Sequence, residues 1–118
     1  MLTGILLEES LEDAAAVQDL HVVATERWPI PRPAAFQPAV WTALRFQEED
    51  GRAWEIMDRL SRALKPAWYV NASTDTAVYV AFRGRLFSYG KGDAAARAQV
   101  VRHGLSVGVP ARQLDWPE

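Results

Sequence analysis

Residues 39–47 alternate strictly between two sets of side chains. Val40, Thr42, Leu44 and Phe46 form one set, and Trp41, Ala43 and Arg45 form the other. Successive side chains of a strand point to opposite sides, so a period of two predicts a β-strand. An acidic turn ends this strand, and apolar residues then recur at helical spacing: Trp54, Met57, Leu60 and Leu64. Because Pro66 stops the second pattern, we expect a helix over residues 51–64.

A proline-rich segment separates this region from the first part of the chain, with Pro29, Pro31, Pro33 and Pro38. Proline fixes φ and lacks a backbone N–H, so neither a helix nor a central strand can run through residues 29–38. The segment is predicted to be an extended loop.

The remaining elements follow from shorter patterns. Ser10 stands where it can cap a helix over residues 11–19, and Asp93 where it can cap one from residue 94 to about 103. Pro110 can begin a short terminal turn, with Leu114 and Trp116 holding the tail. Strands are expected at 3–8, 21–28, 67–72, 76–83 and 86–89. The predicted fold is therefore α+β and mainly antiparallel: a ferredoxin-like β-α-β-β-α-β order with an added C-terminal β-hairpin strand and helix.

Length and composition limit the classes of protein that fit. At 118 residues the chain has the size of one domain, and 49% hydrophobic with 24% charged residues is a globular composition. The absence of cysteine excludes thiol catalysis, iron–sulfur clusters and disulfides. No signal peptide or membrane span is recognisable, so we expect a cytoplasmic protein. Arginine outnumbers lysine, which suggests GC-rich coding and a bacterial source.

No catalytic or cofactor motif survives a test of its context. The two histidines, His21 and His103, lie far apart in the sequence. Residues 90–95 fit G-x-G-x-x-A, but the preceding strand ends a hairpin and no strand follows to complete a dinucleotide-binding unit. Acidic clusters stand at 8–9, 12–13 and 48–50, and two of them fall at predicted helix starts, where the helix dipole explains them. We therefore expect no catalytic residue, cofactor or metal.

Residues 82–89 interleave arginine with aromatic side chains, as RNA-stacking strands do. The net charge of −2 provides no bulk positive field, although residues 60–118 are basic and residues 1–59 acidic. The aromatic pattern also follows the second helix, where an RNA-recognition module would not have it. Nucleic-acid binding at this hairpin is therefore the third choice among functions.

The far face of the predicted sheet is the most informative feature. If Val40, Leu44, Phe46, Val78, Val80 and Phe82 face the helices, alternation places the following side chains on the opposite face: Trp41, Arg45, Tyr69, Tyr79 and Arg83. A face this aromatic requires a cover, which could be the last helix, a second copy of the protein or a ligand.

These five residues are therefore the predicted binding site of a non-catalytic binding or self-assembly module. The expected partner is a second copy of the chain, as a homodimer, or another protein. A small ligand or an enzymatic role at the same face is the alternative.

Overall fold

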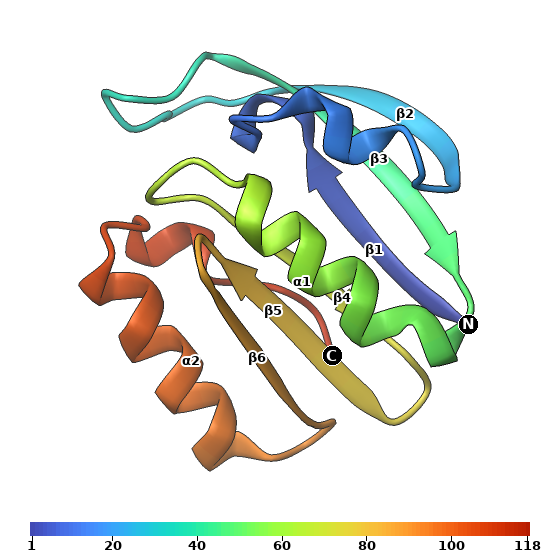
Figure 1. The fold of residues 1–118 in the computed structure, drawn as a ribbon. Helices are drawn as coiled ribbons and strands as arrows, with labels where there is room; N and C mark the ends of the chain where they lie inside the picture. The colour runs from blue at the N-terminus through green and yellow to red at the C-terminus, as the bar shows by residue number, and fades with distance from the viewer.

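Six strands form one antiparallel sheet in the computed structural model, which describes residues 1–118 (Figure 1). In chain order they are β1 (Leu2–Leu7), β2 (Val22–Pro29), β3 (Val40–Glu48), β4 (Tyr69–Ser73), β5 (Ala77–Phe82) and β6 (Arg85–Gly90). Their order in the sheet is β2-β3-β1-β4-β5-β6. The two α-helices are α1 (Ala53–Ala63) and α2 (Ala94–Ser106). The structure is thus an α+β domain.

The strongest sequence patterns form the elements they predicted. The alternating segment becomes β3, and the helical pattern after it becomes α1, whose buried residues include Ile56, Met57 and Leu60. The N-cap predicted for α2 is present, because the carboxylate of Asp93 accepts a hydrogen bond from the backbone N–H of Ala96 at 3.0 Å. Residues 30–39 contain no strand or helix, as their prolines require.

Helix α1 covers one face of the sheet, which we call the first face (Figure 1). Its apolar side packs on side chains from the central strands, among them Leu2, Leu6 and Phe46. Each of these three is at most 1% exposed. Ser61 ties the helix to β5, since its hydroxyl donates to the carbonyl of Phe82 at 2.6 Å. This layer is the larger of the two hydrophobic cores.

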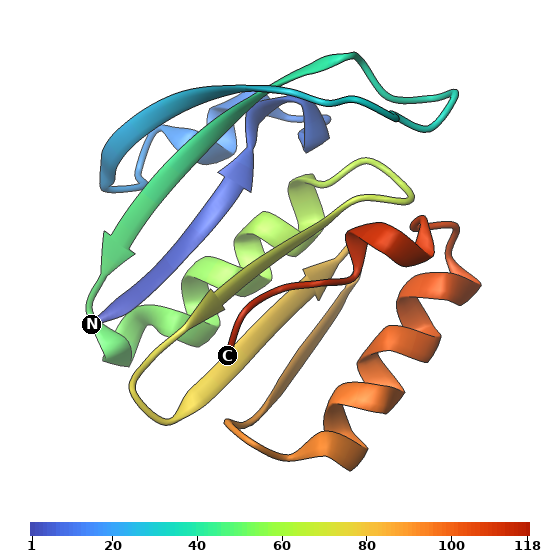
Figure 2. The same ribbon diagram turned by 180° about the vertical axis from the view of Figure 1, so that it is seen from behind.

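The second face of the sheet is covered over only half its width. Helix α2 and the C-terminal segment, residues 109–118, pack against the β4–β6 half (Figure 2). The second core consists of strand residues and residues of this cover: Val78, Val80, Phe82 and Tyr89 with Val100, Val109, Leu114 and Trp116. Leu114 and Trp116 hold the tail, as the sequence predicted.

The helix predicted over residues 11–19 is wrong. One short 3₁₀ turn stands there instead, η2 (Ala14–Val17), and another, η1 (Glu8–Ser10), comes just before it. The backbone N–H groups of Glu12 and Asp13 donate to the carbonyl of Ala63 in α1, at 2.8 and 3.4 Å, so they are not available to an α-helix. Ser10 makes no cap, because its hydroxyl donates to the carbonyl of Leu7 at 2.5 Å.

The predicted facing of β5 is also wrong. Residues paired across a sheet share a face, and Val80 pairs with Asn71, which pairs with Ile5, which pairs with Arg45. Val78, Val80 and Phe82 therefore lie on the second face, under α2, whereas Tyr79 lies on the first face with Ala72. The strand is apolar at almost every position because both of its faces are covered.

Candidate functional site

A cleft of about 810 Å³ opens on the second face, beside the half that α2 covers. Ile5 and Leu7 of β1 and Trp41 of β3 lie on one side of it. The C-terminal segment, residues 109–117, forms the other side, where it crosses the sheet (Figure 2). Residues 30–32 of the proline-rich loop also line it. The cleft therefore lies where the chain's own cover of this face ends.

Five aromatic rings line this cleft: Trp28, Trp41, Trp68, Tyr69 and Trp116. Trp41 and Trp68 meet edge to face, with ring centroids 5.2 Å apart, and both are buried. Tyr69 and Trp116 make a similar contact at 5.6 Å. Trp28 pairs across the strands with Trp41 and is half-buried. Such edge-to-face packing holds the rings in fixed positions, so the lining is preformed.

Asn71 places an amide among these rings. It stands in the middle of β4, on the second face, between Ile5 of β1 and Val80 of β5. Its side chain is half-buried in the cleft lining and makes no hydrogen bond to any group of the chain. A half-buried amide among apolar neighbours is costly unless water or a ligand satisfies it. Asn71 therefore offers a donor and an acceptor to a molecule in the cleft.

Hydrogen bonds fasten the proline-rich loop to the C-terminal segment at one end of the cleft. The amides of Gln37 and Gln113 bond to each other in both directions, at 2.9 and 2.8 Å. Next to them the guanidinium of Arg112 donates to the carbonyl of Arg32. Gln37 is buried and also accepts from the backbone N–H of Ala34 at 3.0 Å. Two segments far apart in the sequence thus form one rim.

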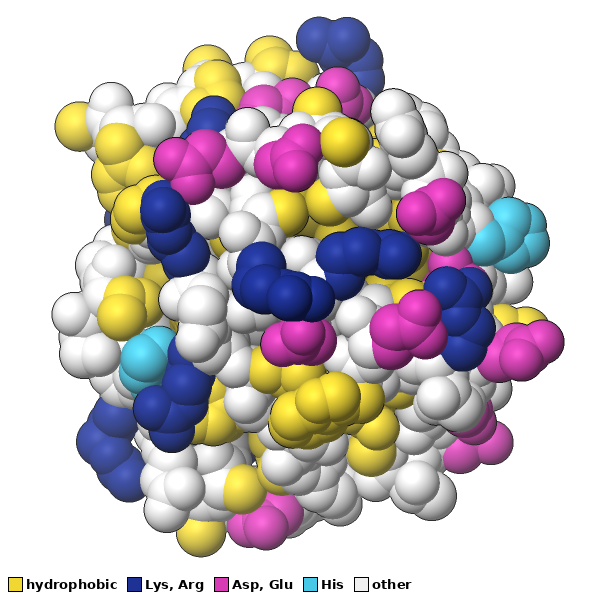
Figure 3. All heavy atoms as spheres, viewed as in Figure 1, with side chains coloured by type: hydrophobic (Ala, Val, Ile, Leu, Met, Phe, Trp, Pro, Cys, Tyr) yellow, Lys and Arg dark blue, Asp and Glu magenta, His cyan; other side chains and the backbone are white.

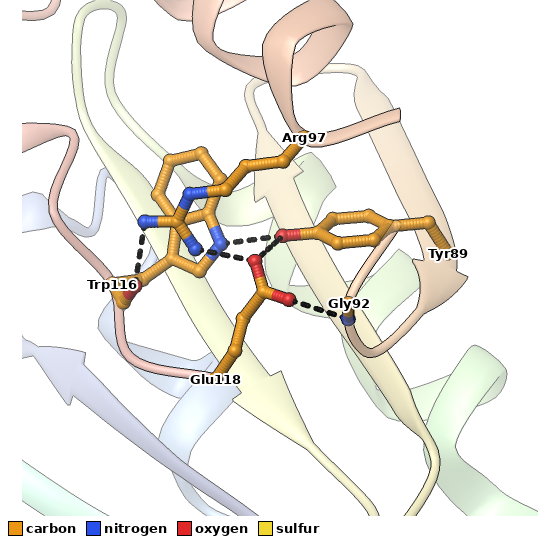
Figure 4. Close-up of polar contacts among 5 residues, drawn as sticks. All are labelled: Tyr89, Gly92, Arg97, Trp116 and Glu118. Carbon is orange, nitrogen blue, oxygen red and sulfur yellow. Dashed lines mark hydrogen bonds and ion pairs between the residues drawn. The ribbon is translucent and has the colours of Figure 1, made fainter. Parts of the chain in front are cut away.

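The C-terminal segment is held in place by a second cluster of polar contacts (Figure 4). The carboxylate of Glu118 accepts from Arg97 at 2.6 Å and from the backbone N–H of Gly92 at 3.0 Å. These donors lower the pKa of Glu118 below its ordinary value, with the Gly92 bond the largest cause. The indole N–H of Trp116 donates to the hydroxyl of Tyr89 at 2.8 Å, and Arg97 stacks on the indole ring.

The cleft contains few ionisable groups: Arg32, Tyr69, Arg112 and Asp115. The hydroxyl of Tyr69 donates to the carbonyl of Gln113. Burial raises the pKa of Tyr69, and the nearby charge of Asp115 raises it further, so this phenol stays protonated. Two arginines and one aspartate give the lining a formal charge of +1.

The five residues predicted to form a binding face do not lie together. Trp41 and Tyr69 line the cleft. Arg45 lies on the same face but outside the lining, where it forms an ion pair with Glu26, with Nε 2.9 Å from Oε2. Tyr79 packs on the first face, and Arg83 lies in the turn after β5. The shared face predicted for them is therefore wrong for Tyr79 and Arg83.

The sequence reasoning missed most of the cleft. Asn71 had a usable signal, because Tyr69, Asn71 and Ser73 alternate with the buried Val70 and Ala72. Arg112 and Gln113 had none, since nothing in their own segment shows that it crosses the sheet.

The arginine and aromatic side chains of residues 82–89 are largely engaged with each other and with neighbours. Arg83 forms an ion pair with Glu12 at 2.8 Å, and Arg85 lies over the ring of Phe87, 4.7 Å from its centroid. On the face that carries α1, basic and acidic side chains are mixed (Figure 3). No group of three acidic or histidine side chains comes close enough to hold a metal ion. Neither helix is long and apolar enough to span a membrane.

Comparison of the chain with models of protein families, with curated proteins and with solved structures gave no match. The function therefore has to be inferred from the cleft.

Proposed function

We propose that the protein is a non-catalytic binding module and that its site is the cleft on the second face. The observation that supports this most is the combination of preformed aromatic walls with the unpaired amide of Asn71. Clefts that bind small organic molecules are mostly apolar, have volumes of roughly 300–1,000 Å³ and carry a few polar groups that orient the ligand. At about 810 Å³ this cleft falls in that range.

The lining favours binding over catalysis. It contains no serine, histidine, lysine or glutamate, so a nucleophile with an adjacent base is not available there. Its phenol, Tyr69, is engaged with the carbonyl of Gln113 and has a raised pKa, which makes it a poor proton donor or acceptor near neutral pH. What the cleft offers is contact area and hydrogen bonds.

A second copy of the chain is the next candidate occupant. The unpaired edges of the sheet are where self-association would begin, and the β2 edge is the more exposed. This edge carries a bulge between Val22 and Ala24 and ends at Pro29, and both features oppose pairing with another strand. The small-ligand function is therefore the better supported of the two.

A neutral aromatic probe tests the proposal. Phenylnaphthylamine fluoresces when it enters an apolar site, and we expect the protein to bind it with saturation, at one site per chain. Trp28→Ala should weaken binding, because Trp28 contributes a half-exposed ring to the cleft. Trp54→Ala is the matched control, since Trp54 is 58% exposed on α1, away from the lining.

Loss of probe binding in both variants, or in neither, would contradict the assignment of the site. Light scattering on the same samples measures the oligomeric state. If the wild type is a dimer and Trp28→Ala makes it a monomer, the occupant of the cleft is a second copy of the chain and not a small ligand.

Further expectations from the sequence concern the fold relationship, the location and source of the protein, and nucleic-acid binding. The order β2-β3-β1-β4 supports a ferredoxin-like relationship for the first four strands, while the missing first helix counts against it. A cytoplasmic location and a bacterial source stay predictions from the sequence. Nucleic-acid binding stays the weakest function, because Arg83 is paired with Glu12.

A further inference from the structure

We propose that the cleft selects planar aromatic molecules that carry a single negative charge, such as an aromatic carboxylate or sulfonate. This inference rests on the proposed binding function and adds to it the chemical class of the ligand. Three observations support it: two arginines without an acidic partner, an amide without a hydrogen bond, and rings on several sides of the cleft.

The arginines of the cleft differ from most other arginines of the protein. None of the eight ion pairs in the structure includes Arg32 or Arg112. The hydrogen bond from Arg112 to the carbonyl of Arg32 holds the two residues next to each other at the rim. A guanidinium has five N–H donors, so Arg112 keeps donors free for an anion.

The charge of the lining sets how much negative charge a ligand can carry. Arg32 and Arg112 attract an anion, whereas the carboxylate of Asp115, on the same C-terminal segment as Arg112, repels it. The net charge of +1 is balanced by one negative charge and not by two. The protein as a whole has a net charge of −2, so this attraction is local to the cleft.

The other two observations describe the body of the ligand. Trp28 and Tyr69 present ring surfaces to the cleft, and planar aromatic molecules stack on or pack against such rings. Asn71 lies on the sheet between Ile5 and Val80 and can donate to an oxygen of the ligand or accept from an N–H. A flat ring with one polar substituent would satisfy both features.

Two probes that differ only in a sulfonate test the charge. Anilinonaphthalene sulfonate is the anionic derivative of phenylnaphthylamine, and we expect it to bind about tenfold more tightly, as one charge-assisted hydrogen bond provides. The preference should disappear in about 1 M sodium chloride, where the Debye length is about 3 Å. The affinity of the neutral probe serves as the reference for any effect of salt on apolar contacts.

Charge-matched variants locate the attraction. R32Q/R112Q should lose about tenfold more affinity for the sulfonate than for the neutral probe. R27Q/R102Q removes the same charge from two exposed arginines outside the lining and should keep the preference. In the NMR spectrum, saturation with the sulfonate should shift the side-chain amide signals of Asn71.

The results separate the two proposals. Equal affinity for both probes would overturn the anionic class and leave the binding function in place. Binding of neither probe would overturn both. A sulfonate preference that both double variants lose equally would show general charge attraction, and would overturn the assignment to Arg32 and Arg112.

Discussion

Replacing Gly4 with alanine would place a methyl group where the folded chain has no space. Gly4 stands in β1 on the first face, between Phe46 and Ala72. A Cβ there would lie 2.6 Å from the Phe46 ring, 2.7 Å from Cβ of Ala72 and 2.7 Å from the carbonyl oxygen of Asn71. The carbonyl oxygen of Asn71 is part of the β4 backbone, and Cβ of Ala72 is attached directly to it. Phe46 is only 1% exposed under α1. None of the three can move without displacing its neighbours.

Overpacking of a core costs roughly 1–3 kcal/mol, and contacts this short belong at the upper end. Alanine recovers about 0.5–1 kcal/mol through its smaller loss of backbone entropy on folding. We therefore expect Gly4→Ala to lower the free energy of unfolding by about 2 kcal/mol, which for this chain length corresponds to about 8 °C in Tm.

Urea unfolding followed by tryptophan fluorescence measures this difference. Gly51→Ala is the control, because a Cβ at Gly51 meets nothing within 4 Å. The reasoning fails if Gly4→Ala unfolds within about 0.5 kcal/mol of the wild type at an unchanged m-value.

Three further predictions follow from single contacts. Ser61→Ala should lower the free energy of unfolding by about 1–2 kcal/mol, because the Ser61 hydroxyl is buried and donates to the carbonyl of Phe82. The same change at the exposed Ser106 should cost less than about 0.5 kcal/mol, and thermal unfolding compares the two variants. Burial, and then the charge of Arg85, lower the pKa of His103 below 6.5. The unfolded chain then binds the proton of His103 more readily than the folded chain does, so the free energy of unfolding should fall as the pH drops from 6.5 towards the folded-state pKa. His103→Gln should remove this part of the pH dependence. An NMR titration that gives His103 a pKa at or above 6.5 would refute the prediction. Gln113→Ala leaves the buried amide of Gln37 without its partner, so chymotrypsin should cleave after Phe36 faster than in the wild type or in Gln99→Ala.

The sequence was sufficient for the elements whose patterns are strong and local. Strand β3 has one face against α1, so its alternation was easy to read, and α1 has an apolar stripe between clear start and stop signals. The short strands around residues 67–89 also formed as predicted, because turn residues separate them.

The two errors in the fold have physical reasons that no local pattern contains. Residues 11–19 are not an α-helix because their backbone bonds to Ala63 and because Leu11 bridges to Leu64, and both partners are distant in sequence. The facing of β5 could not be predicted because its two sets of alternate residues are both apolar. Val78 and Tyr79 are equally suited to a core. The positions of the two helices decide that Val78 faces α2 and that Tyr79 lies on the face covered by α1.

The common face predicted for the five residues was wrong for the same reason. The sequence suggested the last helix as a possible cover of this face, but not that the C-terminal segment crosses it and forms one wall of the cleft. Trp41 and Tyr69 were identified from their own strands, but Arg112 and Gln113 enter the site only through tertiary structure.

The pairing of Gln37 with Gln113 also determines when the cleft can exist during synthesis. These residues are separated by 76 positions in the sequence, and the wall that contains Trp116 comes later still. A nascent chain that ends before residue 113 can pair its first four strands and bury them under α1, yet it has no closed rim and exposes the rings of Trp28 and Tyr69. The cleft can therefore be completed only after residues 113 and 116 have been synthesised, and a ligand that binds it can recognise only chains that contain this wall.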